Sequence, residues 1–442
     1  MSASTSKGMR WTRGALAILG VGAVALTGCT AGGGGGSASA GETTVTVMYQ
    51  SNEFSKDDIA AFEKANPGIK IDFIEYDETR LNAMLTAGDP PDFVRGSPSA
   101  NLFARGLAAP LDDYLAESDV LKKDDLLPVN DAWRWDGKTR GEGKLYGVIK
   151  DFSPDTTVWV NTALLAQAGV EVPSATEPMS WDDLLADAVK LKAAGIAYPL
   201  GIEWQWGVSS LFQTMILQQG GTVYNDDMTK VDLATPEAER ALQWLTDYGT
   251  AGVGPTSLNP LADGWDLPVY STGQMAMTLD GYWFGGGLQS QDAAAVAGTS
   301  TLIPAPTFGE RLSPVFGGVG AWIPEASKNK DAAWKVMEFF MGEDPAVARS
   351  KSGWGLPVLD SLWTNLPTAE PYQQTAMDTA KGELDHAKPL ADSPYITATV
   401  WNDAIDKVLQ STIKGEASVD DALKTLQGEI NDALAQGKDQ LG

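Results

Sequence analysis

The sequence predicts an α/β protein of two lobes, each a doubly wound sheet flanked by helices, with the lobes joined by crossing strands. From Thr44 onward, short strands with alternating apolar residues are followed by amphipathic helices. The same strand–helix pattern starts again after residue 150. The chain has 442 residues, of which 43% are hydrophobic, so it is long enough to build two separate cores.

The first lobe begins with strand 44–49, in which Val45 and Val47 alternate with threonines. A helix opened by Ser55, a strand at 69–73, a helix at 79–87 and a strand at 92–95 complete the pattern. Loops that follow parallel strands meet at one edge of a sheet. We therefore expect polar side chains to gather there: Gln50, Asn52, Glu53, Ser97, Ser99 and Asn101.

The second lobe follows a break at Phe152–Asp155, after which residues 157–161 are expected to cross between the lobes as a strand. Its further elements are a helix opened by Ser180, a strand at 199–202, a helix at 208–219, a helix starting at Pro236 and a strand at 274–280. A second crossing strand is predicted within 316–324, and the carboxyl end is helical. The predicted division is 44–150 with 312–352 for the first lobe, and 151–311 with 353–442 for the second.

The stretch from Ser271 to Gly287 is the most informative part of the chain. Residues 274–280 alternate as in a half-buried strand, and three aromatic residues follow it, Tyr282, Trp283 and Phe284, between Gly281 and a run of three glycines. All three rings could be core, because aromatic side chains bury large areas. The flanking glycines favour another interpretation, in which a flat ligand presses against the rings.

The amino terminus predicts export. Lys7, Arg10 and Arg13 precede a short apolar run at 15–26, typical of a secretory signal. Leu26–Cys29 resembles the lipobox of bacterial lipoproteins, so residues 1–28 are expected to be removed and Cys29 to be lipidated. Residues 29–43 are rich in glycine, serine and alanine and would form a flexible tether to the membrane.

Charge and composition restrict the partners. The chain carries 58 acidic and 32 basic residues, for a net charge of -26, which repels nucleic acid and anionic lipid. Contact with a membrane should therefore be covalent or through another protein. The single histidine, His386, cannot by itself build a zinc site or a Ser-His-Asp triad. We expect no metal, no cofactor and no catalytic residues.

Four segments, taken in order, resemble family 1 of the extracellular solute-binding proteins, which capture sugars for ABC importers. They are Ile59–Ile71, Ala87–Asp92, Gln274–Met277 and Ser418–Leu423. The resemblance implies a two-lobed periplasmic-binding-protein clamp with crossing strands as its hinge, and a ligand site in the cleft. It also implies a pair of membrane permeases with a cytoplasmic ATPase as partners, and no enzymatic activity. We expect a monomer.

A sugar has an apolar face and a rim of hydroxyl groups, so its site needs aromatic plates and hydrogen-bonding groups. The candidate plates are Trp204, Trp206, Tyr282, Trp283, Trp322 and Trp354. The candidate partners for hydroxyl groups are Gln50, Asn52, Glu53, Ser97, Ser99, Asp151, Asp155 and Asp280. Each of these eight polar residues can equally be a turn or cap residue.

Two alternatives stay open on the sequence. An exported glycoside hydrolase needs two carboxylates across a cleft, and a chain with 58 acidic residues can supply such a pair. The same clamp could also take a polyamine, a metal or a phosphorylated polyol. A phosphate favours arginines or helix-start amides, and Arg95 is the one basic residue near the predicted edge. The identity, length and linkage of a sugar do not follow from the sequence.

Overall fold

The computed structural model describes residues 41–314 and 318–441. The predicted signal segment, Cys29 and the tether up to residue 40 lie outside the described residues. Within the described ranges, no helix combines the length and the apolar character needed to cross a membrane.

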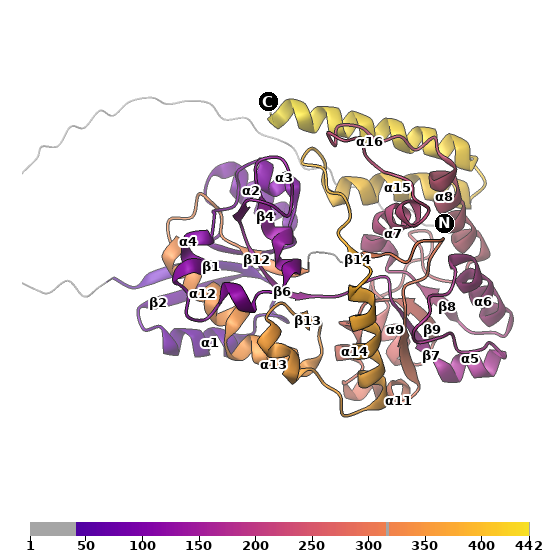
Figure 1. Cartoon of the computed structure of the whole chain (residues 1–442), viewed down its shortest axis with the longest axis horizontal. Helices are drawn as coiled ribbons and strands as arrows, with labels where there is room; N and C mark the ends of the chain where they lie inside the picture. The colour runs from indigo at the N-terminus through magenta and orange to yellow at the C-terminus, as the bar shows by residue number, and fades with distance from the viewer. Residues whose placement is uncertain (1–40, 315–317, 442) are drawn as a thin grey trace, which may run out of the picture. The chain divides into compact units, whose positions relative to one another are not determined.

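The first sheet has six strands in the order β13-β6-β12-β3-β1-β2 (Figure 1). Strand β1 pairs in parallel with β2 and β3, whereas β12 runs antiparallel to both β3 and β6, and β13 runs antiparallel to β6. The strands are β1 (Thr43–Tyr49), β2 (Ile69–Glu75), β3 (Phe93–Gly96), β6 (Val148–Phe152), β12 (Val319–Trp322) and β13 (Leu356–Pro357).

The first two helices start and stop where local chemistry predicts. The Ser55 hydroxyl accepts a hydrogen bond from the backbone N–H of Asp58, and the Asp58 carboxylate accepts one from the backbone N–H of Ser55, so a capping box opens α1 (Lys56–Ala65). Asp77 caps α2 (Glu78–Ala87), which ends at Gly88 in the left-handed conformation that glycine adopts readily. The predicted strand–helix alternation of this lobe is confirmed.

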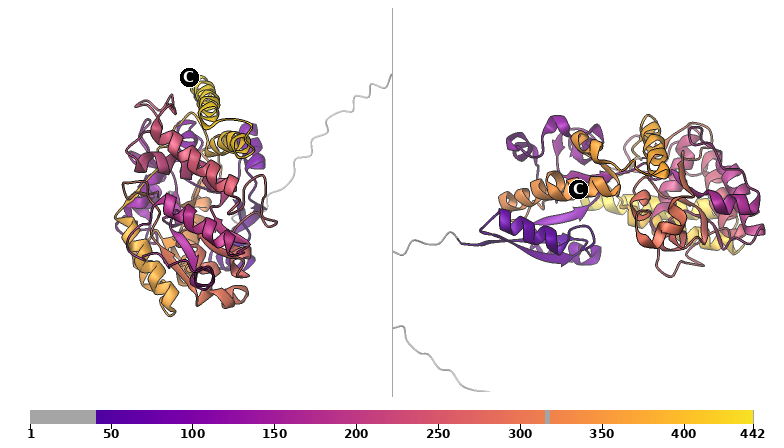
Figure 2. Two further views of the ribbon diagram at one scale, coloured as in Figure 1. Left: turned by 90° about the vertical axis from the view of Figure 1, so that its right-hand side faces the viewer. Right: turned by 90° about the horizontal axis from the view of Figure 1, so that it is seen from below.

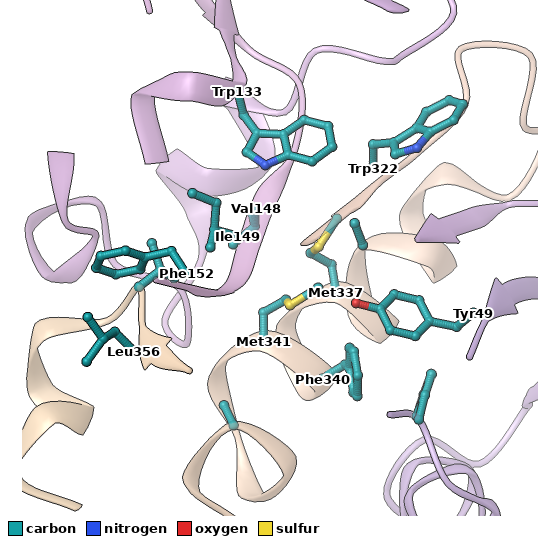
Figure 3. Close-up of a cluster of buried hydrophobic side chains, with 14 of the residues drawn as sticks. Tyr49, Trp133, Val148, Ile149, Phe152, Trp322, Met337, Phe340, Met341 and Leu356 are labelled. Carbon is teal, nitrogen blue, oxygen red and sulfur yellow. The ribbon is translucent and has the colours of Figure 1, made fainter. Parts of the chain in front are cut away.

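The core of the first sheet forms around α12 (Lys330–Gly342), whose apolar face packs against the strands (Figure 3). The ring centroid of Phe340 lies 5.0 Å from that of Tyr49 and 4.4 Å from that of Phe54. The Tyr49 hydroxyl donates to the Gly320 carbonyl at 3.2 Å, which links β1 to the inserted strand β12. Trp322 belongs to the same buried cluster.

The second sheet has four strands in the order β10-β7-β9-β8. They are β7 (Val158–Asn161), β8 (Tyr198–Gly201), β9 (Met275–Leu279) and β10 (Ser300–Ile303). Strand β9 is parallel to β8 and antiparallel to β7. All five residues of β9 are buried, so the expectation of a half-buried strand was wrong. Its side chains contribute to both hydrophobic clusters of the protein, Met275 to one and Met277 to the other.

Four helices share a hydrophobic cluster with strands of the second sheet: α7 (Trp204–Gln218), α8 (Pro236–Ala251), α15 (Ala398–Ile413) and α16 (Val419–Leu441). Both α15 and α16 contribute apolar residues to one cluster, and they lie side by side in Figures 1 and 2. Helix α7 begins at Trp204, four residues before the predicted start. Trp204 and Trp206 therefore lie on a helical turn and not in a loop.

The remaining elements are short or lie at the edges. The helices are α3 (Ala100–Ala104), α4 (Asp112–Glu117), α5 (Thr162–Ala168), α6 (Trp181–Ala193), α9 (Leu267–Ser271), α10 (Phe284–Gly287), α11 (Ala294–Ala297), α13 (Asp344–Ser352) and α14 (Pro371–Leu384). The two-residue strands are β4 (Arg134–Trp135), β5 (Lys144–Leu145), β11 (Ser313–Pro314) and β14 (Ala387–Lys388). Four 3-10 turns occupy Lys123–Asp125, Pro128–Trp133, Gln291–Ala293 and Asp360–Asn365.

The mixed α/β architecture with two main sheets agrees with the predicted fold class. Strand β6 continues to Phe152, which pairs with Leu356 of β13. Both residues lie near the start of a segment that was predicted to belong to the second lobe, 151–311 or 353–442. In the structure both belong to the first sheet. The division of the chain into the two lobes stays a prediction.

Candidate functional site

Three partly exposed tryptophans, Trp265, Trp283 and Trp354, form a group that we call the indole cluster. The ring of Trp283 is nearly parallel to that of Trp265, with 14° between the planes and 6.4 Å between the centroids. Trp354 lies 5.8 Å from Trp283, centroid to centroid, at 58°. The cluster joins segments that are far apart in the sequence.

Two glycines without side chains, Gly285 and Gly286, allow tryptophan rings to pack directly against the backbone. A Cβ atom on Gly286 would lie 2.8 Å from the Trp354 ring, and one on Gly285 would lie 3.0 Å from the Trp159 ring. These glycines were predicted to make room for a flat ligand. In the structure they make room for the protein's own indoles, and Gly285 and Gly286 belong to the short helix α10.

Asp155 lies where the turn after β6 meets the turn after β9. A Cβ atom on Gly281 would lie 2.0 Å from the Ser153 hydroxyl oxygen and 2.5 Å from Asp155 Oδ1, so only glycine fits between them. The backbone carbonyl of Gly281 accepts a hydrogen bond from Trp159 Nε1 at 2.9 Å. Burial raises the pKa of Asp155 to about 7, against a smaller lowering by the Ser153 hydroxyl.

A chain of ion pairs runs along the adjoining edge of the first sheet. Glu53 accepts from Arg95 Nε at 2.7 Å and from Lys150 Nζ at 2.7 Å, and only 1% of the Lys150 side chain is exposed. Burial alone would raise the pKa of Glu53, but Lys150 and Arg95 outweigh it and lower this pKa to about 2. Glu53 is thus ionised and held in a fixed position.

Asp151 extends this chain of ion pairs towards Trp354. Its Oδ2 lies 3.3 Å from Lys150 Nζ and 3.7 Å from Arg349 Nε, and it is buried without a hydrogen-bond partner among the described residues. Burial raises the pKa of Asp151 despite the two cations. A cavity of about 10 Å³ beside Asp151 and Arg349 has room for one water molecule.

The structure brings four predicted site residues together: Asp151, Asp155, Trp283 and Trp354. Asp151 lies beside Trp354 because β13 pairs with β6, and a Cβ atom on Gly355 would lie 2.7 Å from the Cβ atom of Asp151. Asp155 lies beside Trp283, whose indole contributes to lowering its pKa. The two acids and two indoles therefore form one continuous candidate site.

The other four predicted plates lie elsewhere. Trp204 is 4% exposed, donates from Nε1 to Asp406 Oδ1 at 2.6 Å and stacks on Tyr248, which places it in the core. Tyr282 is 3% exposed and Trp322 is 2% exposed. Trp206 is 49% exposed on α7, so its ring is available but is not part of the indole cluster.

The remaining predicted polar residues are dispersed. Gln50 and Asn52 follow β1, and Ser97 and Ser99 follow β3. Asn52 and Ser97 are exposed, and Ser99 precedes α3 without forming a side-chain cap. Asp280 is 1% exposed and accepts from the Thr278 hydroxyl at 2.6 Å, so it is interior and not at the surface.

Several residues of the site were missed. Trp265 lies in a segment without strand or helix periodicity, and only its proximity to Trp283 in space reveals it. Lys150 and Arg349 were missed because their roles depend on which strands are neighbours in the sheet.

A second cavity, of about 250 Å³, lies on α6 and α8 and has exposed acidic residues in its lining.

Comparison with known proteins identifies the class. Residues 50–347, more than half of the chain, match the profile of the bacterial extracellular solute-binding proteins. The chain belongs to this family, whose members are binding components and not enzymes. A Brucella abortus protein that is named as a binding protein is 27% identical over 363 residues, which cover 79% of this chain and 81% of the relative.

Solved structures of two-lobed solute-binding proteins share the fold. An ABC substrate-binding protein from Listeria monocytogenes in complex with cycloalternan superposes with a TM-score of 0.74 at 23% identity, covering 89% of this chain and 99% of that one. A solute-binding protein from Thermotoga lettingae bound with α-D-tagatose gives 0.73 at 20% identity, covering 89% and 99%. The predicted fold class is confirmed.

Proposed function

We propose that the protein is the substrate-binding lipoprotein of an ABC importer and captures a sugar, an oligosaccharide in particular, at the indole cluster. The observation that carries the proposal is the meeting of three partly exposed indoles with Asp151 and Asp155 in one place. The solved relatives named above hold carbohydrates, which supports this class of ligand.

The chemistry of the cluster suits a sugar. The indole faces offer flat apolar area to C–H groups, and the two carboxyl groups offer acceptors to hydroxyl groups. Covering about 50 to 80 Å² of one indole at ~25 cal/mol per Å² contributes roughly 1 to 2 kcal/mol. Three indoles and a few hydrogen bonds reach the ~8 kcal/mol of micromolar binding.

Binding would act by favouring a closed form. A ligand that contacts both lobes stabilises the arrangement in which both contacts exist, in proportion to its differential affinity. Membrane permeases would then recognise the closed protein, and the sugar would be released to them unchanged. Function of this kind requires no reacting group, in keeping with the family.

The test is a thermal-shift screen of the purified protein against mono- and oligosaccharides, followed by calorimetric titration of the sugars that raise Tm. Trp283→Ala should weaken binding at least about tenfold, since it removes the central ring of the cluster. Trp363→Ala is the matched control, because Trp363 is also partly buried but bonds to Pro357 and lies outside the cluster. Its affinity should equal that of the wild type.

Two results would contradict this proposal. Equal losses of affinity in both tryptophan variants would show that the cluster is not the site. Release of shorter sugars during long incubation with an oligosaccharide would show an enzyme in place of a carrier.

The anchoring half of the proposal rests on Cys29, the only cysteine of the chain. In bacterial cells the wild-type protein should fractionate with the membrane, and Cys29→Ser should release it in soluble form without changing its sugar affinity. Retention of Cys29→Ser in the membrane fraction would rule out a lipid on this thiol.

A further inference from the structure

Three buried carboxyl groups meet near the carboxyl ends of β8 and β9. Glu203 follows β8, Asp280 follows β9, and Asp266 precedes α9; each offers one oxygen, and these oxygens all lie within 4.8 Å of one another. The three residues are 6%, 1% and 1% exposed, in the order Glu203, Asp266, Asp280. Strands β8 and β9 are parallel neighbours, so their carboxyl ends bring Glu203 and Asp280 together.

No positive group of the described residues compensates these acids. The charged neighbours that raise the pKa of Glu203 and of Asp280 are other acids. Bringing three negative charges together in a buried space is strongly unfavourable unless a cation or protons neutralise them. The group therefore has to take up a cation or protons.

One oxygen of the group is free to take such a species. Asp280 Oδ2 accepts from the Thr278 hydroxyl at 2.6 Å, but Asp280 Oδ1 is buried and has no hydrogen-bond partner among the described residues. Buried polar atoms in folded proteins are nearly always bonded, so an unbonded carboxylate oxygen in this place indicates a missing partner.

The surrounding backbone leaves room for these oxygens. A Cβ atom on Gly201 would lie 2.1 Å from Asp266 Oδ2 and 2.8 Å from the Thr278 hydroxyl oxygen. Any side chain at this position would occupy the space that the acids share. The Thr278 hydroxyl also lies 2.8 Å from Asp266 Oδ2, which adds a neutral oxygen to the set.

We propose that Glu203, Asp266, Asp280 and Thr278 form a binding site for one Ca²⁺ ion. All four donors are oxygens, which is the ligand type that hard divalent cations prefer. Ca²⁺ takes six to eight oxygens at about 2.3–2.6 Å, and the spacing of the carboxylate oxygens is compatible with a shared ion at those distances.

The ion would have a structural role. It would tie the ends of β8 and β9 to the start of α9, and it would fix Asp280 at the start of the turn that ends in Trp283. This inference goes beyond the proposed function, because the site takes a cation and does not require a sugar to be bound.

The test compares the chelator-treated protein with the same protein in millimolar CaCl₂. Ca²⁺ should raise Tm by at least about 3 °C, since a ligand that binds only the folded state stabilises it. Tb³⁺ should report the site directly through emission sensitised by Trp204, the neighbour of Glu203 in the sequence. Ca²⁺ should displace Tb³⁺.

Variants separate this site from the acidic surface. Glu203→Gln and Asp266→Asn should weaken Ca²⁺ binding at least about tenfold, because each removes one anionic ligand. Without Ca²⁺ both variants should be as stable as the wild type or more stable, since each relieves repulsion. Glu239→Gln is the control: it removes a carboxylate from the exposed cavity on α8 and should leave Ca²⁺ binding unchanged.

The proposal fails if Ca²⁺ does not change the Tm of the wild type, which would mean that the three acids are neutralised by protons alone. It also fails if Glu239→Gln loses as much Ca²⁺ affinity as Glu203→Gln. Sugar binding is measured separately, so neither outcome bears on the assignment of the indole cluster.

Discussion

Asp155 changes its protonation within the physiological pH range. Its pKa is raised from 3.8 to about 7, mainly by burial. In the unfolded chain the carboxyl group ionises near its ordinary pKa, so between these two values the unfolded state releases a proton that the folded state keeps. This group therefore removes stability from the folded protein as the pH rises towards 7.

Asp155→Asn should reverse that loss, because asparagine does not ionise. The difference in Tm between variant and wild type should grow in favour of the variant from pH 4.5 to pH 7 and then level off. Thermal unfolding at several pH values measures it. A difference that does not vary with pH would show that Asp155 titrates at its ordinary value.

At this scale the sequence predicted part of the site. Trp283 was predictable because a strand, a glycine and an aromatic run stand next to one another in the chain. Tyr282, from the same run, is 3% exposed, and no local signal distinguishes it from Trp283. Which ring of such a run faces outward depends on tertiary packing, and so does the meeting of Trp265 with Trp283.

At the scale of elements, Lys150 is the link between three strands. Lys150 lies on β6, and its ammonium group forms an ion pair with Glu53, which follows β1. Glu53 also forms an ion pair with Arg95 on β3. The strands, helices and helix caps around the first sheet were predicted from local patterns. The ion pairs were not, because they require that β12 insert between β3 and β6, which is a property of the whole sheet.

Lys150→Met should destabilise the protein by about 3 kcal/mol or more, because it leaves buried carboxylates without their partner. Chemical denaturation measures this change. Lys70→Met is the control, since Lys70 and Glu63 form a pair at the surface and its loss should have little effect. A loss at Lys150 no larger than the loss at Lys70 would contradict a structural role for the buried pairs.

Helix α7 shows a different limit of local patterns. The segment Glu203–Gly207 reads as a loop because it contains glycine and two tryptophans, which are weak helix formers. In the structure Trp204 packs on Tyr248 of α8, and this contact accompanies a helix that starts early. Tertiary packing here outweighs the intrinsic preference of the four residues Trp204–Gly207.

For the whole molecule, charge distinguishes between the possible ligands. With a net charge of -26, binding of a charged ligand should depend strongly on ionic strength, whereas a neutral sugar interacts through stacking and hydrogen bonds. We expect sugar affinity to change less than about twofold between 50 and 500 mM NaCl. Titrations at both salt concentrations measure it. A much larger change would favour a polyamine or a phosphorylated polyol.

The order of strands in the first sheet also governs when this protein can fold. Strand β12 lies between β3 and β6, and β13 closes the edge, yet both come from residues 319–357. A chain that emerges from the ribosome or a secretion channel, amino terminus first, lacks an interior strand of this sheet until most of its length has appeared. Completion of the first sheet must therefore wait until residues 319–357 have been made, after most of the chain.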